Sequence, residues 1–488
     1  MPAGVPFPSM TLSSHSSEPG SIAGGTDTAQ AVGEGVVLVK TSPERILQGD
    51  WYRMPLLGLG YLAAYLRERK VSVDIVDAMF DRLSLADMVK RIEEKRPRLV
   101  GFTAMTHEIR RAAEVARRLR EVLPRVKVVV GGPHASALPG ETLREFPEFD
   151  YAVFGEGEET LWQLYRALES GETALDAIAG LVFRRGSEIV VNAPREWAVD
   201  LDALPMPAWD LYGPSEVYQM YASRGCPFQC IFCMRVLGER VRTRSPRNVA
   251  DEFESVVERF QPRRIDFSDE TFTLRREWVF EICDEIVRRG LHHKVEWFAN
   301  GRVNVVDREV LVRMREAGCV RVGFGIESGN AEILKAAQKG TSIDQIRNAI
   351  AAAKDVGLEV EAFYILGFPG ETLRTALDTI RLAARLNTTT AAFGIMVPYP
   401  GTKVAEMAAR GEGGYRLLSR DWSDYDKHLG NALELASLSR RKLELLQMAG
   451  YLWFYTRNFR LASLGRFLWE KRKAVGKISR KIFISRKR

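Results

Sequence analysis

Short apolar stretches alternate with helical stretches along the first third of the chain, and this alternation constrains the fold more than any other feature. Five strand patterns lie at 36–40, 71–76, 99–103, 126–130 and 151–154. Helical patterns of roughly 10–15 residues separate them, and this is the spacing of parallel sheets covered by helices on both faces. The sequence therefore predicts an α/β, doubly wound domain of the flavodoxin type at residues 35–170, with ligands bound beyond the carboxyl ends of its strands.

Glycines directly follow the last two of these strands. The strand at 126–130 runs into Gly131-Gly132-Pro133-His134, and the strand at 151–154 runs into Gly155-Glu156-Gly157. Such glycines let a large ligand approach the backbone, although a tight turn between strand and helix would also use them. No G-x-G-x-x-G ends the first strand, so the pattern disfavours a dinucleotide.

A second alternation of strands and helices begins near residue 217. Its strand patterns lie at 217–223, 264–268, 295–299, 320–327, 359–366 and 391–397. Six βα units in series are typical of a barrel, in which the chemistry lies where strands end and loops begin. We therefore expect the functional residues of this region at its strand ends.

Three of the five cysteines, Cys226, Cys230 and Cys233, follow the first of these strands. A Gly and a Pro keep this stretch from being a helix, so the thiols lie on a loop and can converge. Thiolates suit zinc or an iron–sulfur cluster. A structural zinc site normally takes four protein ligands, whereas Cys283 and Cys319 lie far along the chain in helical and strand-like patterns. Three thiolates leave one metal position open, which suits catalysis.

At these residues the sequence resembles the radical S-adenosylmethionine (SAM) enzymes, whose hallmark is C-x3-C-x-aromatic-C. Here it reads Cys226-Pro-Phe-Gln-Cys230-Ile-Phe232-Cys233, and Glu327-Ser-Gly-Asn330, Lys339-Gly-Thr341 and Gly367-Phe-Pro-Gly-Glu371 extend the resemblance over about 217–410. Together these motifs leave little room for the zinc alternative. The resemblance implies a partial, TIM-like (β/α)6 barrel at 216–420, in which the three cysteines hold a 4Fe–4S cluster and SAM chelates its open iron.

The resemblance also implies residues for SAM at the strand ends. The acidic end of the second strand would hold the SAM amino group, Glu327 the ribose, and Asn300 or Arg302 the carboxylate or ribose. Phe232 would pack against the adenine, with ordinary core packing as the alternative, and a helix N-cap is the alternative for the residues at 268 and 269. The implied SAM-contacting residues are Phe232, Ser268, Asp269, Glu270, Asn300, Arg302, Glu327, Ser328 and Gly367.

The first domain resembles the cobalamin-binding domain that precedes the barrel in one large subfamily of these enzymes. The matching stretches are Gly58-Leu-Gly-Tyr-Leu-Ala63, Gly101-Phe-Thr-Ala104, Gly131-Gly-Pro-His134 and Gly155-Glu-Gly-Glu158. The cobalamin contacts that the resemblance implies are Thr103, Gly131, Gly132, Pro133, His134, Gly155, Glu156 and Gly157. Many such domains supply a histidine to the lower face of cobalamin within D-x-H-x-x-G after the first strand, and this chain has no such motif. We therefore expect cobalamin without a protein histidine ligand, and His134 as part of the pocket lining.

The remaining segments are read from composition. Residues 1–34, rich in Ser, Gly, Pro, Thr and Ala, are expected to be disordered, and 171–215 to be a linker with a hairpin at 180–191. A helical region at 421–488 ends in a basic tail. Between Arg457 and Arg488 there are 12 Lys or Arg against one Glu, a charge of +11, which leaves −4 of the total +7 for the rest of the chain. A basic tail on an acidic body does not predict nucleic-acid binding.

Two interpretations of this tail stay open. Its aromatic and basic residues suit an interfacial helix on an anionic membrane or a lipid substrate, while a helix packed on the barrel with a solvated basic end is the simpler alternative. No apolar run reaches the ~18 residues of a spanning helix, no Lys or Arg precedes Lys40, and the cysteines show no paired spacing. We therefore expect a cytoplasmic protein, with peripheral membrane contact through the tail as the second interpretation.

Together the two resemblances imply a cobalamin-dependent radical SAM methyltransferase. A SAM-derived radical would activate an unactivated carbon and methylcobalamin would deliver the methyl group, so that each methylation consumes two SAM molecules. The substrate would be a small molecule, of hydrophobic natural-product or lipid type, and a flavodoxin or ferredoxin would supply electrons. The alternatives are non-methylating chemistry such as oxidative cyclisation or ring rearrangement, and a non-catalytic cobalamin-binding sensor.

Overall fold

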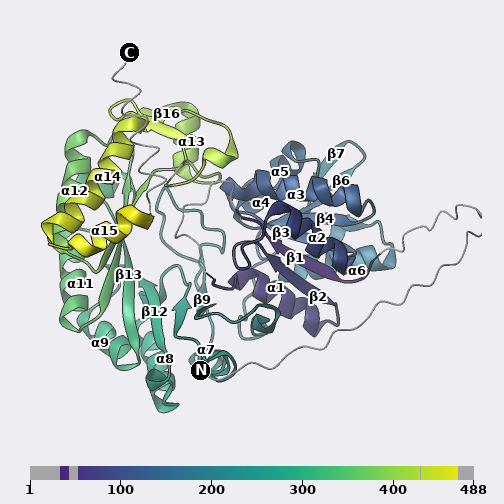
Figure 1. Ribbon diagram of the computed structural model, residues 1–488, viewed down its shortest axis with the longest axis horizontal. Coiled ribbons are helices and arrows are strands. Elements are labelled where there is room, and N and C mark those ends of the chain that lie inside the picture. Colours follow the sequence, from purple (N-terminus) through teal and green to yellow (C-terminus); the bar gives the residue numbers. More distant parts are fainter. Residues whose placement is uncertain (1–32, 43–52, 429, 471–488) are drawn as a thin grey trace, which may run out of the picture.

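The computed structural model describes residues 33–42, 53–428 and 430–470, which form an α/β domain and an open barrel side by side (Figure 1). Nearly all of the segment 1–34, and the part of the basic tail beyond residue 470, lie outside the described residues.

The first domain is built on a seven-stranded sheet of order β2-β1-β3-β4-β5-β6-β7. Its strands are β1 (Val36–Lys40), β2 (Val73–Asp77), β3 (Leu99–Thr103), β4 (Lys127–Gly131), β5 (Tyr151–Val153), β6 (Leu181–Arg185) and β7 (Glu188–Val191). The first five are parallel and follow the flavodoxin order, which confirms the predicted fold class.

Helices cover both faces of this sheet. In β1, Val36 and Leu38 pack with α1 (Leu57–Glu68) and α6 (Glu158–Ser170) on one face. Val37 and Val39 pack on the other face. The helices there are α2 (Leu85–Lys95), α3 (Ile109–Val122), α4 (Pro133–Ala137) and α5 (Pro139–Glu145). A strand buried on both faces reads as a continuous apolar run, and this made β1 recognisable.

The hairpin expected in the linker belongs to the first domain. Its strand β6 pairs antiparallel with β5 and so covers the edge that β5 would otherwise expose. Leu181, Val182 and Phe183 are buried in the two cores of the domain. The local alternation predicted the hairpin, but its partner strand lies outside that local pattern.

The second domain is a six-stranded, all-parallel open barrel of order β15-β14-β13-β12-β11-β8. Its strands are β8 (Val217–Met220), β11 (Arg264–Phe267), β12 (Glu296–Gly301), β13 (Cys319–Glu327), β14 (Glu359–Leu366) and β15 (Thr390–Ile395). The helices of this domain are α7 (Pro246–Phe260), α8 (Arg276–Arg288), α9 (Arg308–Glu316), α10 (Ala331–Ala336), α11 (Ile343–Asp355), α12 (Leu373–Leu386) and α13 (Lys403–Arg410). Since β8 and β15 do not pair with each other, the barrel is partial, as predicted.

The C-terminal region is less uniformly helical than expected. A small antiparallel pair, β16 (Tyr415–Leu417) and β17 (Leu433–Leu435), precedes α14 (Arg440–Arg457) and α15 (Leu461–Glu470). Helix α14 packs on the barrel, where Phe454 is fully buried. Between the two strands, Trp422 donates a hydrogen bond from Nε1 to Glu145 of the first domain at 2.7 Å. This region therefore connects the two domains.

Candidate active site between the two domains

A cavity lies where the carboxyl ends of β3, β4 and β5 face the barrel. Glycines form much of its wall, at Gly58, Gly101, Gly131, Gly132, Gly155 and Gly157. The backbone at Gly132 and Gly155 has φ of +91° and +77°, which L side chains rarely adopt. A Cβ added to Gly58 would meet nothing within 4 Å. A wall of bare backbone fits a large ligand that lies against the sheet edge, as cobalamin would.

Seven of the eight residues expected to contact cobalamin line this cavity. They are Thr103, Gly131, Gly132, Pro133, Gly155, Glu156 and Gly157. The interpretation of these seven as cobalamin contacts stays a prediction.

His134 is the exception, and its placement in the pocket lining was wrong. Helix α4 begins directly before it, and the imidazole packs edge-on against Trp422, with ring centroids 5.1 Å apart, and against Phe146. The residue is 1% exposed, and neither ring nitrogen has a hydrogen-bond partner among the residues that the structure describes. Burial lowers the pKa of His134 to about 4, so the ring is neutral near pH 7.

The three motif cysteines lie on a loop whose ends are held together by a short antiparallel pair, β9 (Ser223–Arg224) and β10 (Arg242–Thr243). Gly225 has φ of +95°, and a Cβ there would lie 2.4 Å from the Arg240 carbonyl oxygen, so only glycine fits. The backbone N–H of Cys226 donates to the Gly238 carbonyl oxygen at 3.1 Å. We call residues 225–241 the cysteine loop.

The thiols of the cysteine loop act on one another electrostatically. Cys230 is buried, Cys226 is half-buried and Cys233 is partly open to solvent. Desolvation by the surrounding protein, followed by the charges of Cys230 and Cys226, raises the pKa of Cys233 to about 11. The described residues contain no group of three or more His, Cys, Asp or Glu that could hold a metal ion. In a 4Fe–4S cluster each thiolate binds a different iron, so its ligands stand further apart than those around one ion.

Two cationic side chains lie beside the thiols. Arg302, at the end of β12, donates from Nη1 to Cys230 Sγ at 3.4 Å and places its guanidinium 3.8 Å from the Phe228 ring centroid. Lys339 pairs with Glu327, with 2.8 Å between Nζ and Oε1, and both side chains are buried. Both Lys339 and Glu327 act electrostatically on Cys233. Arg302 and Glu327, two of the predicted SAM-contacting residues, thus lie at the cysteine loop.

Glu327 adopts a strained conformation. Its φ is +65°, and the register between β13 and β14 shifts between Gly325 and Glu327. A left-handed non-glycine residue costs on the order of 1–2 kcal/mol. This irregularity turns the carboxylate at the strand end towards Lys339, and such strain is typical of binding sites.

Asp269 and Ser328, both predicted to contact SAM, form hydrogen bonds within the protein, and their contact with SAM stays a prediction. Asp269 is buried and accepts hydrogen bonds from Ala222 N at 3.1 Å and from the Ser223 hydroxyl, and burial raises its pKa to about 7. Ser328 is buried against Thr379, with 3.1 Å between their hydroxyl oxygens. Neither Ser268 nor Asp269 caps a helix with its side chain, so the capping alternative fails too.

The other predicted SAM-contacting residues take different positions. Glu270 is exposed beside the cysteine loop, and Asn300 at the end of β12 lies against Gly323 of the neighbouring strand. Phe232 is half-buried and meets Phe368 edge-on, with centroids 5.4 Å apart. Its contact with adenine stays a prediction, as do those of Ser268, Glu270 and Asn300.

Gly367 begins a tight turn at the end of β14 with φ of +99°. Sequence reasoning assigned no role to Glu371, which holds this turn: its carboxylate accepts hydrogen bonds from Gly367 N and from Phe368 N, the latter at 3.3 Å. Glu371 is fully buried, and burial raises its pKa to about 7. The visible sequence signal was an acidic residue four positions after the glycine that directly follows β14.

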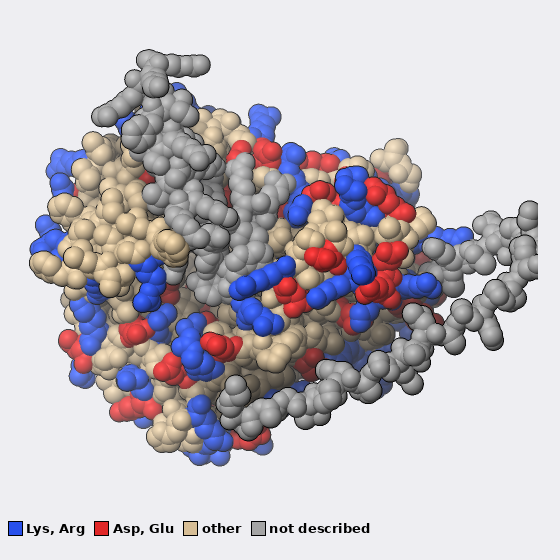
Figure 2. Space-filling model, in the orientation of Figure 1, with Lys and Arg blue, Asp and Glu red and all other residues tan. Residues whose placement is uncertain are grey.

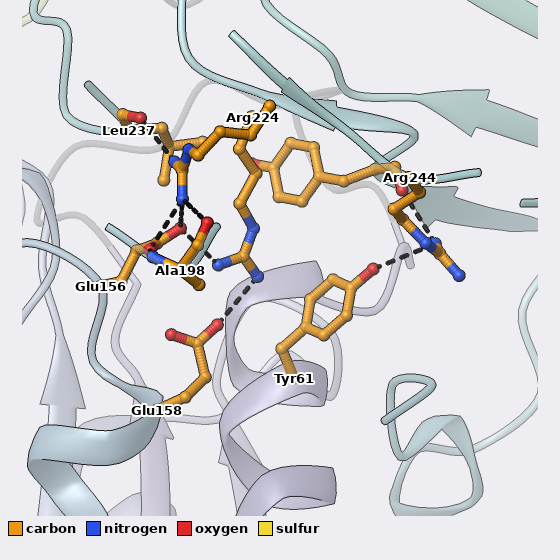
Figure 3. Close-up of polar contacts among 9 residues, drawn as sticks. Tyr61, Glu156, Glu158, Ala198, Arg224, Leu237 and Arg244 are labelled. Atoms are coloured by element: carbon orange, nitrogen blue, oxygen red, sulfur yellow. Dashed lines mark hydrogen bonds and ion pairs between the residues drawn. The ribbon is translucent and has the colours of Figure 1, made fainter. Parts of the chain in front are cut away.

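Glu156, expected to contact cobalamin, directs its carboxylate to the barrel (Figure 3). Its Oε1 accepts from Arg224 Nη1 and from Arg242 Nη1, both at 2.9 Å, and its Oε2 accepts from Ala198 N at 2.9 Å. Although burial opposes ionisation, the two arginines hold the pKa of Glu156 below its usual value. Sequence reasoning also missed Arg224, although an arginine next to the first motif cysteine was a visible signal.

Comparisons with known proteins agree with this geometry. A family model described as the B12 binding domain matches residues 51–164, and one described as the radical SAM superfamily matches residues 220–383. An uncharacterized methyltransferase, PH0819, of Pyrococcus horikoshii is 35% identical over 413 residues, which are 83% of this chain and 88% of the relative. The anaerobic magnesium-protoporphyrin IX monomethyl ester cyclase of Cereibacter sphaeroides is 32% identical over 73% of this chain and 60% of the relative.

Two solved structures share the fold over both domains. The radical SAM methyltransferase TsrM from Kitasatospora setae, with cobalamin and a [4Fe-4S] cluster bound, superposes with a TM-score of 0.68 at 18% identity and covers 87% of this chain and 89% of that one. The cobalamin-dependent radical SAM enzyme OxsB, with aqua-cobalamin bound, has a TM-score of 0.70 at 17% identity and covers 86% of this chain and 67% of that one. Cobalamin, a 4Fe–4S cluster and SAM are the cofactors of this family. This chain therefore belongs to the cobalamin-dependent radical SAM enzymes.

Proposed function

We propose that this enzyme transfers a methyl group from SAM, by way of cobalamin, to an unactivated carbon of a hydrophobic natural-product or lipid-like substrate. One observation carries the proposal: the cavity that suits cobalamin and the loop that bears the cysteines share a wall. Val236 and Leu237 of the cysteine loop line that cavity, opposite the glycines of the first domain. The Pyrococcus relative carries the name methyltransferase, which also supports methyl transfer as the reaction.

The residues of this chain would bind and orient the cofactors. The cavity wall from Thr103 to Gly157 would receive cobalamin, Cys226, Cys230 and Cys233 would hold the iron–sulfur cluster, and Glu327 and Gly367 would face SAM. When bound, these groups supply a hydrogen-abstracting radical and a transferable methyl group. The protein contributes position and the exclusion of water.

Several described residues suit that task. Leu38, Leu59 and Leu161 contribute apolar surface to the cavity wall, which favours exclusion of water. Arg302 donates to Cys230 Sγ and would stabilise negative charge on that sulfur. Glu371 fixes the turn that brings the Gly367 backbone to the end of β14, where the backbone can approach a nucleoside.

A product measurement tests the proposal. The anaerobically reconstituted enzyme receives a reductant, SAM with a deuterated methyl group, and candidate hydrophobic substrates or a cell extract. We expect a product that gains one deuterated methyl group, with one adenosylhomocysteine and one 5′-deoxyadenosine per product. Formation of 5′-deoxyadenosine without adenosylhomocysteine and without a methylated product would rule methyl transfer out.

Non-methylating radical chemistry is the second candidate, and the cyclase relative at 32% identity favours it. The mass of the product separates the two, because cyclisation removes hydrogen and adds no methyl carbon. A non-catalytic sensor would need neither the cysteine loop nor the buried Glu327–Lys339 pair beside it. Electron delivery by a flavodoxin or ferredoxin stays part of the proposal.

The second interpretation of the C-terminal tail also becomes a proposal. Trp453, Phe459, Leu461 and Trp469 are 53%, 89%, 65% and 69% exposed on and beside α14 and α15. Figure 2 shows an expanse of uncharged surface over these helices with basic side chains next to it. Apolar rings beside arginines suit the surface of an anionic bilayer. No helix within the described residues is long and apolar enough to span a membrane.

A further inference from the structure

The two ends of the cysteine loop bring two arginines together. Arg224 of β9 and Arg242 of β10 are register partners, and they are only 4% and 7% exposed. A guanidinium stays protonated in proteins. Two neighbouring positive charges without counter-charges are costly in the interior, so the loop ends need buried carboxylates to stay paired.

Those carboxylates come from the other domain. Arg224 Nη1 donates to Glu156 and Arg224 Nη2 to Glu158, at 2.9 and 2.8 Å, and Arg242 Nη1 donates to both oxygens of Glu156 at 2.9 Å. Glu156 lies on the turn after β5 and Glu158 is the first residue of α6, and both line the cavity. Figure 3 shows Arg224 extending towards Glu156 and Glu158. We call these four residues the interdomain clamp.

The cysteine loop also reaches the cavity directly. Val236 and Leu237 line it, and the Leu237 carbonyl oxygen accepts a hydrogen bond from Arg242 Nη2 at 2.9 Å. The next residue, Gly238, accepts from the N–H of Cys226 at 3.1 Å. A ligand in the cavity would thus press on a segment that is bonded both to the clamp and to the first cysteine.

A second contact spans the same boundary. Arg244, just beyond β10, donates from Nη1 to the Tyr61 hydroxyl of α1 at 3.4 Å and pairs with the buried Glu252 of α7. Tyr61 also faces the Arg224 guanidinium, which lies 5.0 Å from its ring centroid. Since Tyr61 lines the cavity, both sides of the boundary are fixed by residues that a bound ligand would touch.

We propose that the interdomain clamp couples the two cofactor sites, so that cobalamin in the cavity and SAM at the cysteine loop each tighten the binding of the other. The inference rests on the proposed function. Glu156, Glu158, Arg224 and Arg242 are positioning residues in this account, since they act through the loop. Coupling between two sites is reciprocal, so each ligand must raise the affinity of the other by the same factor.

Binding measurements without turnover test this coupling. The iron–sulfur holoprotein, kept without reductant, is titrated with hydroxocobalamin with and without saturating SAM, followed by absorbance. SAM is titrated by equilibrium dialysis with and without hydroxocobalamin. In the wild type we expect both affinities to rise by the same factor, of about fivefold or more. In Glu156→Gln the factor should fall to near one, because one neutral amide would then face both arginines.

A matched control separates the clamp from general damage. Glu159→Gln alters the next acidic residue of α6, and it should keep the wild-type coupling factor. Within the described part of the chain, the hydrogen bonds to the Glu159 carboxylate come from Tyr65 and Gln163 of the first domain. If Glu156→Gln loses iron or fails to fold, Glu158→Gln replaces it, since it removes one partner of Arg224 only.

Two results would overturn the inference while leaving the proposed function intact. One is that, in the wild type, both ligands bind but neither changes the affinity of the other. The other is a factor that stays at the wild-type value in Glu156→Gln, or in Glu158→Gln where that variant serves. If the wild-type holoprotein binds no hydroxocobalamin or no SAM, the proposed function fails, and the coupling with it.

Discussion

Glu371 gives the sharpest prediction, because its burial makes the stability of the barrel depend on pH. The carboxylate holds the turn after β14 through two backbone N–H groups, and its Oε1 has no hydrogen-bond partner within the described residues. Glu371→Gln keeps the shape of the side chain and the oxygen that accepts from the turn, and it places the amide NH2 at the position of Oε1. We expect the variant to fold and to keep the turn.

The magnitude follows from the pKa. Burial raises the pKa of Glu371 from 4.5 to about 7. A carboxyl whose pKa is higher in the folded protein stabilises it fully below the unfolded value, and that stability is lost as pH rises through the folded value. Two to three pKa units correspond to about 3 kcal/mol. Relative to wild type, the free energy of unfolding of Glu371→Gln should therefore rise by up to about 3 kcal/mol between pH 4.5 and 7.5.

Two measurements check this. In a denaturant titration, hydrogen exchange of the peptide that contains Gly367 reports unfolding of the barrel alone. Wild type and variant are compared in this way at several pH values. Infrared difference spectra between pH 6 and pH 8 should show a carboxyl band in the wild type that the variant lacks. A stability difference that does not change with pH, together with the absence of that band, would refute the account of Glu371.

Three further predictions concern the cavity, the cysteine loop and the C-terminal helices. Gly132→Ala places a Cβ 2.7 Å from a cavity side chain at φ +91° and should weaken hydroxocobalamin binding by about tenfold or more. The control Gly171→Ala, at φ +72° with open space around it, should lose about 1 kcal/mol of stability and bind hydroxocobalamin normally. Equal binding by both variants would contradict a cobalamin site in this cavity. Arg302→Met removes the donor to Cys230 Sγ and should lower the reduction potential of the reconstituted iron–sulfur cluster, measured by redox titration with electron paramagnetic resonance; an unchanged potential would show that the contact is not made in the holoprotein. Flotation with anionic vesicles should recover the intact protein, and a chain truncated at about residue 456 or carrying Trp453→Ser with Phe459→Ser should be lost from the vesicles; failure of the intact protein to bind would end the membrane proposal.

Local patterns predicted the elements of this fold well. The main parallel strands of both domains were predictable because most of them are short apolar runs bounded by turns. The motif cysteines were recognisable because their spacing spans only the eight positions from Cys226 to Cys233. The pairing of β6 with β5 was not visible, since a hairpin pattern does not specify the strand on which it docks.

The orientation of polar side chains was harder to predict from the sequence than the strands and helices. Glu156 stands at a strand end, where a ligand contact was expected, but its carboxylate meets Arg224, 68 positions along the chain. Asp269 likewise bonds to Ala222 and Ser328 to Thr379, 47 and 51 positions away, and His134 packs on Trp422 of the C-terminal region. The partner of each of these side chains is a residue distant in sequence, and tertiary packing determines which residue that is.

The most direct test of the central claim is to count both cofactors on one sample of this chain. After anaerobic reconstitution with iron, sulfide and hydroxocobalamin, the wild type should hold one 4Fe–4S cluster and one cobalamin per chain. The Cys226→Ala, Cys230→Ala and Cys233→Ala variants should lose the iron and keep the cobalamin, because the cavity wall lies mostly in the first domain. A wild-type chain that takes up one cofactor without the other, or that keeps its iron when the cysteines are replaced, would contradict a site built from both domains.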